Sequence, residues 1–144
     1  MPRITRSALV MFSAEQMFKL VNDVDAYPQF LPGCVGSRVH EAGDDYMMAS
    51  VDVAKAGIAK TFTTRNQLDV NRQIRMELVD GPFRKLAGWW TFTPLDVDAC
   101  KVEFDLDFEF TSKLIEVAFG QVFRDLVSSM VSAFSNRAKV VYGV

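Results

Sequence analysis

Six segments between Val35 and Phe110 alternate apolar and polar residues with a period of two, and this repetition most constrains the possible folds of the chain. The last segment, which begins at Cys100, alternates without a break. Short turn sequences separate the segments and favour hairpins. We therefore predict an antiparallel meander with one buried and one solvated face. The predicted strands are Val35 to Glu41, Tyr46 to Ala54, Ile58 to Asp69, Gln73 to Asp80, Lys85 to Thr93 and Cys100 to Phe110.

The N-terminal segment combines a strand pattern with a helix start signal. Residues Arg3 to Val10 are β-prone and predict a seventh strand. Ser13 and Gln16 have the capping-box spacing, which predicts a helix from Ala14 to about Val24. Prolines at positions 28 and 32 limit residues 25–33 to a turn or a second, short helix.

A helical period returns after Ser112. The apolar stripe is formed by Ile115, Phe119, Val122, Leu126, Met130 and Phe134. A helix from Lys113 to Lys139 would be about 40 Å long, which is about the diameter of a globule of this chain length. We therefore predict an α+β fold, in which a curved antiparallel sheet of about seven strands wraps around one long C-terminal helix. The chain length predicts a single domain over residues 1–144.

Charge and cysteine content exclude several classes of protein. Sixteen Lys+Arg and eighteen Asp+Glu give a net charge of −2, so we expect no DNA partner and only local contacts with RNA. Such contacts would use pairs such as Lys55 with Lys60, Arg84 with Lys85, or Arg137 with Lys139. Cys34 and Cys100 are far apart and form no CxxC motif, which favours reduced thiols in the cytoplasm. No apolar run approaches the roughly eighteen residues of a membrane span, and we identify no signal peptide.

Residues that carry enzyme chemistry are few. His40 is the only histidine and ends a predicted strand, and the sequence contains no common nucleophile, zinc or nucleotide-binding motif. Four carboxylates share one face of the last predicted strand at a spacing of about 7 Å, where a solvated surface is favoured over a cation site. They are Glu103, Asp105, Asp107 and Glu109. We therefore predict no catalytic residues, no metal and no cofactor.

The apolar face of the meander carries unexpected polar residues. Thr64 and Asn66 would each need a hydrogen-bond partner or a ligand there, and Gly88 removes a side chain between bulky neighbours. This pattern favours an apolar pocket between sheet and C-terminal helix, and an ordinary packed core is the alternative. From the sheet face and the helix stripe we predict contacts between a ligand and Phe62, Thr64, Asn66, Met76, Trp90, Phe92, Phe104, Phe119, Val122 and Leu126.

Three separated motifs span nearly the whole chain. They are Tyr27-Pro28-x-Phe30-Leu31-Pro32-x-Cys34, then Gly81-Pro82-Phe83-x-x-Leu86-x-Gly88-x-Trp90-x-Phe92, then Asp105-Leu106-Asp107-Phe108-Glu109-Phe110-x-Ser112-Lys113-Leu114. Through these motifs the chain resembles the coenzyme Q-binding family of START-like, polyketide-cyclase-like proteins, and within that family its bacterial ribosome association toxin branch. The resemblance implies a helix-grip fold. It also implies four further residues around the pocket and its mouth, namely Phe30, Leu31, Phe83 and Leu86.

The resemblance implies two functions. Respiratory members are regarded as non-enzymatic binders of ubiquinone and related polyprenyl lipids, so the first expectation is a quinone held between sheet and helix in support of respiration. The toxin branch is described as binding the large ribosomal subunit and blocking subunit joining, often beside a small antitoxin-like protein. The second expectation is therefore an inhibitor of translation initiation, and the third is a cyclase-like enzyme. The expected location is the cytoplasm, with a peripheral position at the inner membrane as the alternative.

Overall fold

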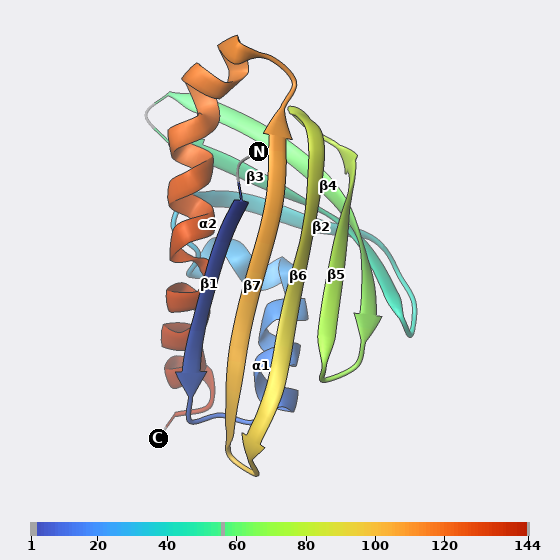
Figure 1. Cartoon of the computed structure of the whole chain (residues 1–144), viewed down its shortest axis with the longest axis vertical. Helices are drawn as coiled ribbons and strands as arrows, with labels where there is room; N and C mark the ends of the chain where they lie inside the picture. Colours follow the sequence, from blue (N-terminus) through green and yellow to red (C-terminus); the bar gives the residue numbers. More distant parts are fainter. Residues whose placement is uncertain (1–2, 56, 144) are drawn as a thin grey trace.

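Seven antiparallel strands form one curved sheet in the computed structural model, which describes residues 3–55 and 57–143 (Figure 1). The strands are β1 (Arg3–Val10), β2 (Cys34–Ala42), β3 (Tyr46–Lys55), β4 (Ile58–Asp69), β5 (Gln73–Asp80), β6 (Phe83–Asp96) and β7 (Ala99–Phe110). Their spatial order is β1-β7-β6-β5-β4-β3-β2, so the meander crosses the sheet and β1 is added beside β7. The predicted antiparallel meander is therefore confirmed.

The bounds of β6 differ most from the prediction. The strand extends beyond the predicted Lys85 to Thr93 at both ends. Its extensions still pair with β7, because Phe83 lies opposite Phe110 and Pro94 lies opposite Cys100. Register shifts interrupt the ladder at both ends of this pairing, which is how an antiparallel pair accommodates an extra residue or a proline.

Two short helices follow β1. In the capping box of α1 (Ala14–Asn22), the backbone N–H of Gln16 donates to the Ser13 hydroxyl, and the backbone N–H of Ser13 donates to the Gln16 side chain. A 3-10 helix, η1 (Val24–Gln29), comes next and contains Pro28. Both the capping box and the short second helix agree with the prediction.

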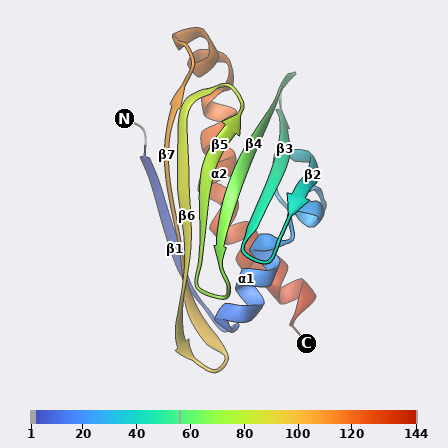
Figure 2. The same cartoon turned by 90° about the vertical axis from the view of Figure 1, so that its right-hand side faces the viewer.

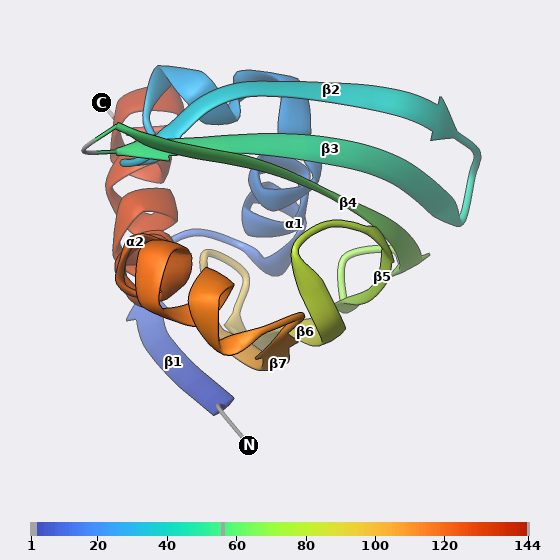
Figure 3. The same ribbon diagram turned by 90° about the horizontal axis from the view of Figure 1, so that it is seen from above.

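The C-terminal helix α2 (Lys113–Val141) lies across the concave side of the sheet (Figures 2 and 3). It begins at Ser112, whose hydroxyl accepts a hydrogen bond of 3.2 Å from the backbone N–H of Ile115. The curved sheet encloses α1 together with one face of α2, which is the helix-grip arrangement. Within residues 3–55 and 57–143, no helix is long and apolar enough to cross a membrane.

The two faces of β7 are as predicted. Its buried residues are Cys100, Val102, Phe104, Leu106, Phe108 and Phe110. On the outer face, Arg3 lies 3.4 Å from Asp105, and Arg84 lies 3.0 Å from Glu109. These ion pairs fit a charged outer surface, and no group of three potential metal ligands occurs in the described part of the chain. Cys34 and Cys100 are free and buried.

Candidate functional site

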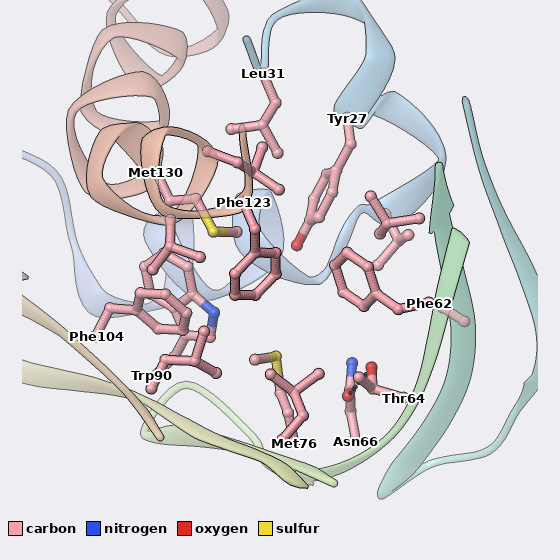
Figure 4. A pocket seen from close by; sticks show the side chains of 17 residues that line it. Tyr27, Leu31, Phe62, Thr64, Asn66, Met76, Trp90, Phe104, Phe123 and Met130 are labelled. Atoms are coloured by element: carbon pink, nitrogen blue, oxygen red, sulfur yellow. Dashed lines mark hydrogen bonds between the residues drawn. The ribbon is translucent and has the colours of Figure 1, made fainter. Parts of the chain in front are cut away.

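An apolar cavity of about 50 Å³ lies between the concave face of the sheet and α2 (Figure 4). Strands β3 to β7 supply its floor and walls, and η1 and α2 cover it. Nine of the residues predicted to contact a ligand line this cavity. They are Leu31, Phe62, Thr64, Asn66, Met76, Leu86, Trp90, Phe104 and Leu126. The alternation of the strands thus identified most of the sheet side of the cavity.

Two hydrogen-bonding groups in the wall have no partner within residues 3–55 and 57–143. The Thr64 hydroxyl donates to the amide oxygen of Asn66 over 2.9 Å, and both residues are 7% exposed. This bond leaves the Asn66 amide nitrogen facing the cavity, and the indole nitrogen of Trp90 borders it from the other side (Figure 4). No described residue accepts a hydrogen bond from either nitrogen. The cavity therefore offers two donors to an acceptor that enters it.

Gly88 shapes the floor of the cavity, as its position between bulky residues predicted. A Cβ atom at Gly88 would lie 2.8 Å from Leu106 Cδ1 and 2.9 Å from Met76 Cε. These distances are shorter than side-chain contacts allow. The missing side chain therefore leaves space over Gly88 for the ends of Met76 and Leu106, which both line the cavity.

Three predicted ligand contacts lie deeper in the aromatic core than the cavity wall. Phe83 and Phe119 both pack against Phe110, with ring centroids 5.2 Å and 6.2 Å from it. Phe92 instead contacts Phe18 of α1, at a centroid distance of 5.8 Å. Face alternation placed these residues inside correctly, but neighbouring rings fill the space between them and the cavity.

Two further predicted contacts lie on the outer side of the cover. The ring of Phe30 packs against Phe134 at a centroid distance of 5.2 Å and lines a surface hollow. Val122 lines a second surface hollow, of about 470 Å³, together with Leu126. Because Leu126 also lines the internal cavity, its side chain separates the cavity from that hollow.

The prediction missed eight residues of the wall. They are Val24, Tyr27, Ala49, Val51, Leu106, Phe123, Val127 and Met130. Val51 and Leu106 lie on inward faces that the alternation identifies, and Met130 belongs to the predicted helix stripe. Phe123 is one position from the predicted Val122, and the helix turns Phe123 towards the sheet instead.

Tyr27 is the only titratable side chain in the described wall of the cavity. Its hydroxyl donates to the backbone carbonyl of Val21. Burial, with smaller contributions from Cys34 and Asp23, raises the pKa of Tyr27 far above its ordinary value. At neutral pH the wall therefore presents no general base and no ready general acid.

The His40 side chain is hydrogen-bonded on the face of the sheet that points away from the cavity. Its Nε2 atom lies 2.6 Å from the hydroxyl of Ser50. Ala49 and Val51, the neighbours of Ser50 on β3, line the cavity. Since successive strand residues point to opposite faces, the Ser50 and His40 pair points away from the cavity.

The free volume is small for a lipid site. A cavity of about 50 Å³ holds one or two water molecules, whereas pockets for drug-sized ligands measure roughly 300–1,000 Å³. A quinone ring with a polyprenyl tail would enter only if side chains moved. Met76 and Met130 are the most adaptable residues of the wall.

Residues 10–135 match the family described as polyketide cyclase / dehydrase and lipid transport. The ribosome association toxin RatA of Escherichia coli strain K12 is 66% identical over 142 residues, which cover 99% of this chain and 90% of that protein. The mitochondrial coenzyme Q-binding protein COQ10 homolog B of Xenopus laevis is 30% identical, over 96% of this chain and 59% of that protein. The aromatase/cyclase Zhui of Streptomyces sp. R1128 has a TM-score of 0.83 at 18% identity, over 96% of this chain and 95% of its own. The likeness to Zhui confirms the predicted fold.

Proposed function

This chain belongs to the polyketide cyclase / dehydrase and lipid transport family, in the branch of the ribosome association toxins, and from this premise we propose that it binds the large ribosomal subunit and blocks subunit joining. The identity of 66% with RatA over nearly the whole chain carries the proposal. Zhui keeps the same fold at 18% identity, so the fold alone does not require 66%. The buried residues are also fewer than the positions that this chain shares with RatA. Part of the shared sequence therefore lies outside the fully buried core, and a macromolecular partner would contact positions of that kind.

The small internal cavity also favours ribosome binding over lipid binding as the function of the chain. A protein that acts through its surface needs a well-packed interior, whereas a lipid carrier needs a large internal space. Quinone binding, the first expectation from the sequence, therefore becomes the second candidate. Binding to the ribosome would place the protein in the cytoplasm, and the small antitoxin-like partner stays a prediction.

Sedimentation with separated ribosomal subunits tests the proposal. The purified chain is mixed with large or with small subunits at low salt and centrifuged through a sucrose gradient. We expect it to sediment with large subunits and to stay near the top of the gradient with small ones. A chain that stays at the top with both subunits at low salt contradicts the proposal.

The second candidate is binding of a hydrophobic ligand that carries a carbonyl group, with ubiquinone or a related polyprenyl lipid as the proposed example. The donors on Asn66 and Trp90, which have no acceptor among the described residues, favour it because an apolar ligand would need acceptors to satisfy both of them (Figure 4). The relative named as coenzyme Q-binding adds support. Titration with a short-chain ubiquinone should quench the fluorescence of Trp90, which borders the cavity, and should not do so in Asn66→Leu. Unchanged fluorescence in the wild type, with the protein folded, contradicts this candidate.

We propose a non-enzymatic role in both cases. Tyr27 is the one titratable side chain in the described cavity wall, and its proton is engaged by the Val21 carbonyl. Acid–base catalysis needs a group whose pKa lies near the working pH, and the burial of Tyr27 moves its pKa in the opposite direction. The aromatase/cyclase shares the fold at low identity, and a shared fold does not carry an activity with it.

A further inference from the structure

Two surface hollows adjoin along α2. One, of about 400 Å³, lies between η1 and the C-terminal half of α2. The other, of about 470 Å³, lies beside the end of β3. The hollows share Pro32 and Ser129, so together they form one groove, which we call the α2 groove. It follows α2 from Val122 to Val140, a length of about 27 Å.

Each end of the α2 groove carries a cation for which the described part of the chain supplies no acidic partner. Neither Lys55 at one end nor Arg137 at the other lies within ion-pair distance of a described carboxylate. Arg38 and Arg84, on the outer face of the sheet, are paired with Asp52 and Glu109. The groove therefore keeps its positive charge available, although the net charge of the chain is −2.

One carboxylate, that of Asp125, is among the described residues of the groove. Its Oδ1 atom accepts a hydrogen bond of 2.8 Å from the side-chain amide of Gln121. An amide leaves the negative charge in place, so Asp125 reduces the attraction of the groove for anions near its middle. We therefore expect anionic contacts at the two ends of the groove.

The guanidinium of Arg137 is held in a fixed orientation. Its Cζ atom lies 5.1 Å from the ring centroid of Phe30, and Nη2 donates to Gln29 over 3.0 Å. Nε is buried and has no partner among the described residues. These contacts leave Nη1 to reach an outside acceptor. A planar guanidinium that is positioned in advance loses little entropy when it binds a phosphate.

The groups around Arg137 suit a nucleotide. Ser132 and Asn136 line the same hollow and offer a hydroxyl and an amide to a ribose or a base edge. Proteins recognise single-stranded RNA by combining phosphate contacts with aromatic or arginine planes on which bases stack. A groove of about 27 Å also has room for several extended nucleotides.

We propose that the α2 groove binds a single-stranded segment of ribosomal RNA, with Arg137 and Lys55 contacting phosphates at its two ends. This inference rests on the proposed association with the large subunit, and it specifies the surface and the chemistry of the contact. The competing partner is an acidic segment of a ribosomal protein. It differs in having no bases to stack and no ribose hydroxyls.

The test compares the affinity of charge variants for purified large subunits over a range of salt concentrations. Log affinity falls as log salt rises. Removing one cation that neutralises a phosphate in a single-stranded site makes the slope of this line less negative by about 0.7. We expect this change for both Arg137→Gln and Lys55→Gln. We also expect Arg137→Gln to weaken binding at low salt by about tenfold or more, because it removes a charged hydrogen bond.

Arg72→Gln is the matched control, because Arg72 is an exposed arginine of the β4–β5 turn, outside the groove and without a described acidic partner. It should bind with the wild-type affinity and slope. Arg137→Gln removes the contact with Phe30 and could therefore lower stability. Lys55→Gln changes an exposed side chain, so a loss of binding in that variant is not explained by misfolding. Thermal unfolding midpoints of all variants are measured alongside.

Ultraviolet crosslinking of the wild type to large subunits identifies the class of partner. Crosslinks from ribosomal RNA to the peptides around Phe30 and Arg137 support the inference. Crosslinks from those peptides to ribosomal protein alone overturn it. If the wild type binds and both folded groove variants keep its affinity and salt slope, the groove assignment is wrong and the proposed function stands. If the wild type itself does not bind, both fall together.

Discussion

The hydroxyl of Thr64 donates a hydrogen bond of 2.9 Å to the amide oxygen of Asn66 in the wall of an otherwise apolar cavity. Residues two apart on a strand share a face, so the two side chains form a polar pair within β4. The pair satisfies one acceptor but leaves the Asn66 amide nitrogen without an acceptor in the part of the chain that the structure describes. Apolar residues of similar shape would pack this wall without placing such a donor against the cavity.

The Thr64 and Asn66 pair predicts a non-additive effect on stability. Thr64→Val should lower the free energy of unfolding by about 1–3 kcal/mol, because it leaves the buried amide oxygen without a donor. The double variant Thr64→Val, Asn66→Leu removes both partners and should recover most of that loss. Urea unfolding at neutral pH measures both values. A double variant as unstable as the sum of its single variants would show that the pair is needed for packing.

Among single substitutions in α2, we expect Phe123→Ala to cause the largest loss of stability. Its ring lies within 6.0 Å, centroid to centroid, of the rings of Phe62, Phe83 and Phe108. Phe123→Ala should therefore cost about 3–5 kcal/mol. The exposed Val117 of the same helix is the control, and Val117→Ala should change stability by less than about 0.5 kcal/mol. Equal losses for the two variants would mean that α2 packs on the sheet through another face.

Because Tyr27 is buried, we expect the protein to lose stability in alkali. Because burial raises its pKa in the folded state, the unfolded chain releases this proton more readily. The contribution of Tyr27 is therefore complete below its ordinary pKa of about 10 and declines as the pH rises above that value. Tyr27→Phe removes this ionisation, so its stability should fall less between pH about 10 and pH about 12. Unfolding curves with the same alkaline decline for both proteins would exclude Tyr27 as the cause.

Local sequence signals predicted much of the fold. The alternation along β7 depends on a two-residue period, and the start of α1 depends on two side chains three positions apart. Both patterns are short in range, so neighbouring residues determine them. The bounds of β6 differ because they depend on pairing with β7, which continues from Phe83 to Asp96 through irregular register.

The cavity wall was less predictable because it depends on how large rings share the interior. Periodicity shows that Phe92 and Trp90 face inward, but not that Phe92 meets Phe18 while Trp90 reaches the cavity. The rotation of α2 decides in the same way between Val122 and Phe123. Such choices depend on side-chain volumes and on the tilt of a helix, which no short sequence pattern records.

The central claim, that this chain binds the large ribosomal subunit and prevents subunit joining, is tested most directly by light scattering. Purified large subunits are incubated with increasing amounts of the chain and then mixed with small subunits. We predict that the scattering amplitude from joined ribosomes falls as the chain is added and reaches its minimum near one chain per large subunit. An amplitude that stays unchanged, at chain concentrations that saturate the large subunit in sedimentation, would contradict the claim.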